Sequence, residues 1–134
     1  MDIRTTTLVW APRILSVLRI VAALLFLEHG TQKILGFPGH PNPPVLLSLS
    51  GIAGLLELIG GALLLVGLFS RPVAFLLSGE MAFAYFIAHA PHSVFPVLNG
   101  GDAAILFCFV FLHIAVSGPG SLSIDAVRAN GSMR

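Results

Sequence analysis

Four apolar stretches, each close to the length that crosses a lipid bilayer, limit what this chain can fold into. They cover residues 14–35, 46–69, 73–90 and 101–117. A membrane-spanning helix needs about 20 mainly apolar residues, and a helix satisfies its backbone hydrogen bonds without water. Only 10% of the residues are charged, compared with about 25% in an ordinary soluble domain. The pattern therefore predicts an all-α, multi-pass integral membrane protein that is embedded in the lipid bilayer.

Short segments rich in proline and glycine separate the stretches. The sequence reads GFPGHPNPP after the first stretch, SRP after the second and PHSVFPVLNGG after the third. Such runs end helices, and short links favour antiparallel neighbours. We predict a single domain, residues 1–134, built as an up-down four-helix bundle. Its polar tail, residues 118–134, is expected to fray beyond Asp125.

Positive charges outside the apolar stretches lie on one side of this predicted bundle. They are Arg4, Arg13, Arg71, Arg128 and Arg134. The two remaining links, Gly36–Leu46 and Pro91–Asp102, contain no Lys or Arg. Because positively charged loops stay in the cytoplasm, both termini are predicted to be cytoplasmic, in the cell inner (cytoplasmic) membrane. The net charge of +1, without a basic run, offers nothing that would hold nucleic acid.

Polar side chains gather where the first stretch reaches the outer side of the membrane. Glu28, His29, Gln32 and Lys33 lie close together in the segment EHGTQK. A helical phase of about 100° per residue puts Glu28 on the same face as Gln32, and His29 on the same face as Lys33. In the second stretch, Glu57 shares a stripe with small residues, which let another helix approach closely. We therefore predict that Glu57 points into the bundle.

The third and fourth stretches contribute polar residues at the same depth. Tyr85, His89 and His92 share one arc of the third stretch. Asn99 and Asp102 stand at the start of the fourth. Together with the polar end of the first stretch and the acid of the second, they predict an interior pocket in the outer half of the bundle.

The same polar residues also fit a purely structural role. A charge in mid-helix costs up to about 2.5–3.5 kcal/mol in lipid, so pairing between helices is expected. The residues that would form such a buried network are Arg19, Glu28, Lys33, Glu57 and Glu80. Glu80 is expected on roughly the opposite side of its helix from His89. Asp102, directly ahead of an apolar run, fits an N-cap or a first-turn acid.

Short motifs follow one another in a defined order along most of the chain. They are HGTQK at the end of the first stretch, ELIGG in the second, the SRP turn, HAPHSVF at the exit of the third, NGGD, and GPGSLSID after the fourth. In this order they resemble the DoxX family of small four-span membrane proteins, over about Arg13 to Asp125. The resemblance implies a membrane subunit of an oxidoreductase complex, because the family takes its name from a subunit resembling that of a thiosulfate:quinone oxidoreductase. Asp102 stands where Glu is commoner in the family, and Ser93 and Val94 stand where a glycine and an aromatic residue are frequent.

A quinone fits the predicted pocket chemically. Its ring needs a flat apolar slot, hydrogen-bond donors at the carbonyls and a protonatable group. Glu57 and His89 are the predicted catalytic residues, which would relay protons. The predicted cofactor-binding residues are Glu28, His29, Gln32, Lys33, Tyr85, His92, Asn99 and Asp102. No residue of the chain carries electrons, so we expect a protein partner or a soluble substrate to supply them, in a membrane complex or a homo-oligomer.

Other functions stay open at this point. We predict no dedicated metal site, but His29 and His89 could ligate haem, or join His92 around copper, although Lys33 would repel a cation. The chain could instead be a non-catalytic anchor or assembly subunit of a larger membrane complex. A small-solute or ion transporter is a further alternative, because intramembrane acids and histidines mark ion pathways. Cys108 is the single cysteine, which excludes an intrachain thiol-pair redox site.

Overall fold

The computed structural model describes residues 2–39 and 45–132, and over these residues the chain is helical. In chain order the elements are α1 (Ile3–Leu35), α2 (Leu49–Val66), α3 (Ser70–Ala84), the π-helical turn η1 (Tyr85–His89), α4 (Pro96–Asn99), α5 (Asp102–Ser117) and α6 (Ile124–Gly131). Among the described residues, three helical segments are long and apolar enough to cross a membrane: α1, α2 and the continuous segment Ser70–His89. α5 is apolar but shorter. The prediction of an all-α protein with membrane-length apolar helices is confirmed.

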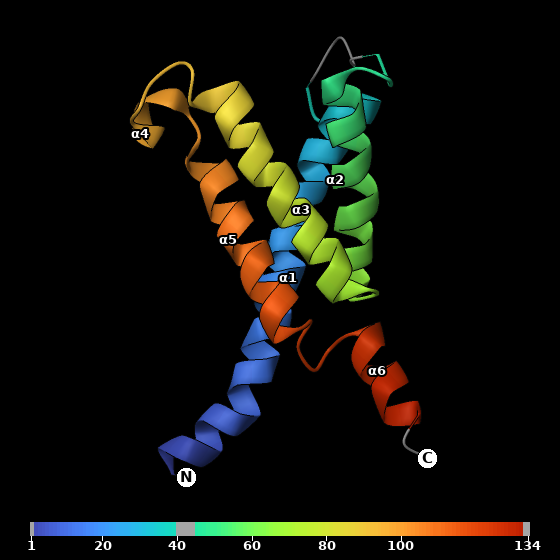
Figure 1. Ribbon diagram of the computed structural model, residues 1–134. Coiled ribbons are helices and arrows are strands. Elements are labelled where there is room, and N and C mark those ends of the chain that lie inside the picture. Colours follow the sequence, from blue (N-terminus) through green and yellow to red (C-terminus); the bar gives the residue numbers. More distant parts are fainter. Residues whose placement is uncertain (1, 40–44, 133–134) are drawn as a thin grey trace.

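The four long helices alternate in direction, as Figure 1 shows. α1 packs mainly on α2, and α3 packs mainly on α5, so the bundle consists of two helix pairs. The pairs cross and then diverge towards the end that carries α4, which we call the outer end (Figure 1). The first turns of α1 and the whole of α6 lie at the opposite, inner end. That the inner end faces the cytoplasm stays a prediction from the arginine positions.

Buried aromatic and aliphatic side chains hold the two pairs together. Phe26 of α1 meets Phe111 of α5 edge-on, with ring centroids 4.9 Å apart, an arrangement that aromatic rings prefer. Leu64 of α2 and Leu77 of α3 are fully buried beside them. Many other large apolar side chains are exposed on the helix surfaces, which suits a protein surrounded by lipid.

Glycines allow α1 and α2 to pack closely against each other. A Cβ atom added to Gly30 would lie 2.6 Å from the backbone nitrogen of Leu58. One added to Gly54 would lie 2.8 Å from Cβ of Lys33. Neither position has room for a side chain, so the two helices touch only because these residues are glycines. This contact brings Lys33 of α1 beside Glu57 of α2.

Helix boundaries differ from prediction at both ends of the chain. α1 begins at Ile3 rather than at residue 14, because a helix needs no apolar residues once it has left the bilayer. The expectation of a frayed tail is wrong. Ser123 accepts a hydrogen bond from the backbone N–H of Ala126 and so caps α6, a helix of eight residues that apolarity alone does not indicate.

Arg19 is fully buried and binds backbone carbonyls instead of acids. Its Nη1 donates to the carbonyls of Leu64 (2.5 Å) and Leu65 (2.9 Å) near the end of α2. Its Nε and Nη2 donate to those of Pro119 (2.9 Å) and Leu122 (2.5 Å), which follow α5. A guanidinium carries five N–H donors in a fixed fork, so one side chain ties three segments together at the inner end. The prediction that Arg19 joins a network of buried acids is therefore wrong.

Asp125 ties the same C-terminal segment to the start of α3. Its carboxylate accepts hydrogen bonds from the backbone N–H groups of Phe69 (3.0 Å) and Ser70 (2.8 Å). Burial alone would raise the pKa of Asp125, but these hydrogen bonds and the nearby charge of Arg128 outweigh it and hold the pKa below its usual value. Because the folded pKa is lowered, this stabilisation is present above the pKa of a free aspartate and is lost as the pH falls through the lowered value.

Candidate functional site

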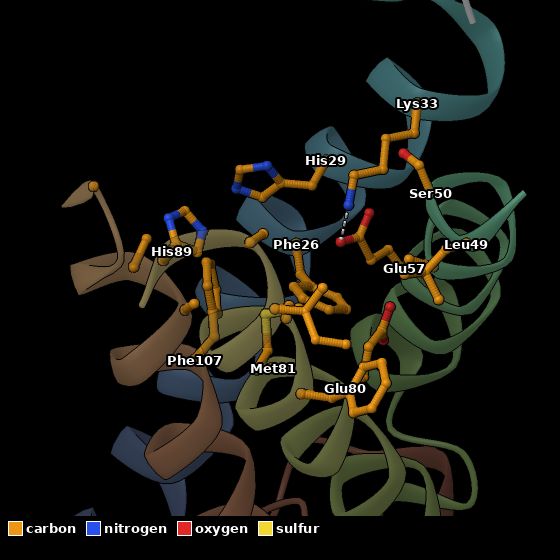
Figure 2. A pocket seen from close by; sticks show the side chains of 18 residues that line it. Phe26, His29, Lys33, Leu49, Ser50, Glu57, Glu80, Met81, His89 and Phe107 are labelled. Carbon is orange, nitrogen blue, oxygen red and sulfur yellow. Dashed lines mark hydrogen bonds and ion pairs between the residues drawn. The ribbon is translucent and has the colours of Figure 1, made fainter. Parts of the chain in front are cut away.

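A pocket of about 490 Å³ lies between the two helix pairs at the outer end. Figure 2 shows it from close by. Side chains from all four long helices line it, and most of them are apolar. The polar and charged residues in its lining are His29, Lys33, Ser50, Glu57, Glu80 and His89. Small-molecule sites measure about 300–1,000 Å³ and share this mainly apolar lining with a few polar groups.

An ion pair joins α1 to α2 on one side of the pocket. Lys33 Nζ lies 2.6 Å from Glu57 Oε1, drawn as the dashed line in Figure 2. The Glu57 side chain is 3% exposed, whereas that of Lys33 is 30% exposed and reaches down from the outer end. A buried carboxylate needs such a partner, because leaving it unpaired in an apolar interior costs several kcal/mol (roughly 3–5).

His89 lies on the other side of the pocket, and its tautomer follows from its neighbour. Its Nδ1 lies 3.0 Å from the backbone carbonyl of Asn99. A carbonyl can only accept, so Nδ1 carries the proton of this hydrogen bond. Nε2 of the neutral ring is then the acceptor nitrogen. Tyr85 stacks on the imidazole, with ring planes 20° apart and centroids 6.4 Å apart, and supports its orientation.

Aromatic rings and a thioether form the floor of the pocket. In Figure 2, Phe107 lies below His89, and Phe26 and Met81 lie below the level of the imidazoles and of the Lys33–Glu57 pair. The imidazole of His29 meets the Phe107 ring edge-on, at 6.1 Å and 89°. The result is an apolar floor with His89 at one side, the ion pair at the other and His29 above, between them.

Glu80 is the pocket residue that the sequence interpretation missed. Both of its carboxyl oxygens are buried, and neither has a hydrogen-bond partner in the part of the chain that the structure describes. The same is true of Oε2 of Glu57. The expectation that Glu80 faces away from His89 is wrong, because both line the pocket. η1 departs from the α-helical phase between them, so counting 100° per residue fails there. An acid in mid-span was itself a usable signal.

Several predicted cofactor-binding residues do not line the pocket. Glu28 is exposed on α1, and Gln32 donates from Nε2 to the carbonyl of Pro38 at 3.1 Å. His92 is exposed beyond η1, and Asp102 is exposed as the first residue of α5. Asn99 instead forms hydrogen bonds within the link between η1 and α5.

The amide of Asn99 spans the link between η1 and α5. Its Nδ2 donates to the carbonyl of Ser93 at 2.8 Å, and its Oδ1 accepts from the backbone N–H of Gly101 at 2.7 Å. With its own carbonyl bonded to His89, Asn99 positions the imidazole rather than facing the cavity. Of the ten residues predicted to act at the site, four line the pocket: His29, Lys33, Glu57 and His89.

Comparisons with known proteins agree on the class of the molecule. The DoxX family profile matches residues 14–90. A protein of Haemophilus influenzae described as uncharacterized is 42% identical over 126 residues, which cover 87% of this chain and 91% of that protein. The inner membrane protein YphA of Escherichia coli is 27% identical over 125 residues, which cover 85% and 89% of the two chains. No solved structure matches significantly. The protein is therefore a multi-pass inner-membrane protein, and it belongs to the DoxX family.

Proposed function

We propose that this protein binds a quinone in the pocket between its two helix pairs and serves as a membrane subunit of an oxidoreductase complex. The observation that supports this most is the placement of polar groups around an apolar floor: His89 lies on one side, the Lys33–Glu57 pair on the other, and His29 above, between them. A quinone ring is flat and apolar on its faces and carries two carbonyl oxygens on opposite edges, so it matches this distribution.

The protein groups at the pocket suit proton exchange with such a ring. A quinone takes up two electrons and two protons when it is reduced to the hydroquinone. Nε2 of His89 can take up and release a proton at one edge of the quinone ring, because Nδ1 is hydrogen-bonded to the carbonyl of Asn99. Oε2 of Glu57 has no hydrogen-bond partner among the described residues, so it can take up and release a proton at the opposite edge of the ring. The electrons must come from a partner protein or a soluble substrate.

One observation favours an alternative role as an anchor or assembly subunit. The pocket side chains already bond to one another or to the backbone, as in the Lys33–Glu57 pair and the His89–Asn99 bond. Such bonds alone would hold the helices of a non-catalytic scaffold together. A scaffold of this kind predicts no retained quinone, so one experiment separates the two roles.

The test is to purify the full chain from native membranes in a mild detergent and to measure the quinone retained per protein. Glu57→Gln is expected to lower the amount of retained quinone by about tenfold or more, since a hydrogen bond to a charged group contributes about 1.5–3 kcal/mol. His89→Ala is expected to lower it by about two- to tenfold, since a hydrogen bond between neutral groups contributes about 0.5–1.5 kcal/mol. His113→Ala is the matched control, because this exposed histidine lies on α5 outside the pocket. Equal retention in all four proteins, each verified as folded, would contradict the proposal.

A further inference from the structure

A second hollow runs along the outside of the bundle, in the seam between α2 and α3. This α2–α3 groove has a volume of about 610 Å³. Apolar residues and Gly79 line it, and Glu80 is its one charged residue among those described. From Phe83 to Pro72 of α3 it follows about 16 Å of helix, at about 1.5 Å per residue. Its walls face the surroundings of the protein, as the exposure of Phe75 and Leu76 shows.

The groove exists because α2 and α3 are loosely joined. Each packs mainly on another helix, α2 on α1 and α3 on α5. At the seam, Gly79 contributes no side chain, and a Cβ atom placed on it would meet nothing within 4 Å. The groove is therefore open space that the protein itself leaves unfilled.

The groove and the pocket adjoin each other. Four residues belong to the lining of both: Leu49, Ala53, Glu80 and Phe83. At these four residues the polar pocket between the helix pairs borders the apolar groove that faces the lipid. The lining changes there from charged and imidazole groups to hydrocarbon.

We infer that the α2–α3 groove holds the isoprenoid tail of the quinone whose ring occupies the pocket, an inference that rests on the proposed function. A compact polar ring with a single long apolar tail matches a polar pocket that borders an apolar groove. A phospholipid fits less well, because its phosphate would meet the carboxylates of Glu57 and Glu80, while Lys33 is already paired with Glu57. The substrate class is then the lipid-soluble, tailed quinones.

Filling the groove without touching the pocket tests this inference. Gly79→Phe places a ring in the open space of the groove, and Gly79→Ala is the matched control that adds only a methyl group. The probes are a dimethoxy-methyl-benzoquinone without a tail and the same ring carrying several isoprene units. Binding of both is measured to the purified full chain in one detergent, by equilibrium dialysis.

We expect Gly79→Phe to weaken binding of the tailed quinone by about tenfold, which corresponds to about 1.4 kcal/mol, because the ring takes the space of the tail. Binding of the tailless quinone should stay unchanged. Gly79→Ala should bind both as the natural chain does. If tailless binding persists in every protein while Gly79→Phe leaves tailed binding unchanged, the groove does not hold the tail and the inference is overturned, although the proposed function stands.

Two other results also overturn the inference. If neither quinone binds the natural chain, the proposed function fails and the inference falls with it. If an excess of phospholipid reduces tailed binding to the tailless level in the natural chain, the groove belongs to an acyl chain. Should Gly79→Phe not purify as folded protein, Leu76→Trp fills the same groove from an exposed position of α3 and carries the same expectations.

Discussion

Replacing Arg19 by methionine is expected to lower the free energy of unfolding by about 3–5 kcal/mol. The guanidinium donates to four backbone carbonyls and is fully buried. Methionine fills much of the volume but leaves these acceptors without a donor in an apolar interior. Unfolding in mixed detergent micelles with increasing denaturing detergent, followed by circular dichroism, measures the difference.

Arg13→Met is the matched control for Arg19→Met. Arg13 is exposed, and its guanidinium lies 5.4 Å from the centroid of the Trp10 ring, an interaction of about 0.5–1 kcal/mol at an exposed site. Arg19→Lys is expected to lose most of the stability as well, because an ammonium lacks the planar fork. An Arg19→Met protein as stable as Arg13→Met would show that the C-terminal segment is not held by this side chain.

The second large effect is expected from Lys33→Met. This change leaves the Glu57 carboxylate, whose side chain is 3% exposed, without its partner, and should lower the free energy of unfolding by about 3 kcal/mol. Adding Glu57→Gln to Lys33→Met removes the stranded charge and should recover part of the loss. The same micelle unfolding experiment compares the natural chain, Lys33→Met, Glu57→Gln and the double variant.

Glu28→Gln is the control for the Lys33–Glu57 pair, since Glu28 is an exposed acid on the same helix, five residues before Lys33. It should change stability by less than about 0.5 kcal/mol. A double variant whose loss equals the sum of the two single losses would mean that Lys33 and Glu57 do not stabilise each other.

The helices and the inward-facing polar residues could be predicted from sequence for simple physical reasons. The thickness of the bilayer fixes how many apolar residues a membrane-spanning helix needs. The four apolar stretches of the sequence therefore predicted the positions of α1, α2, α3 and α5. Helical phase placed Lys33, Glu57 and His89 on inward faces, and all three line the pocket. Their role in binding a quinone stays a prediction.

Other features depend on contacts that leave no local pattern. Arg19 binds the carbonyls of Pro119 and Leu122, about one hundred residues further along the chain, and any residue type presents a carbonyl. The turn of Asn99 that orients His89 depends on how the link between η1 and α5 folds back. Glu80 was misplaced because the π-helical turn changes the phase of α3 near its end.

Photolabelling addresses the central claim, that a quinone ring sits between the two helix pairs, most directly. A benzoquinone carrying an azide on its ring is irradiated with the purified full chain, and the labelled peptides are identified by mass spectrometry. We predict label on the Phe26–Lys33 segment of α1 and on the Glu80–His89 segment of α3 and η1, suppressed by excess unlabelled quinone. Label confined to the lipid-facing surface or to α6, or insensitive to unlabelled quinone, would contradict the claim.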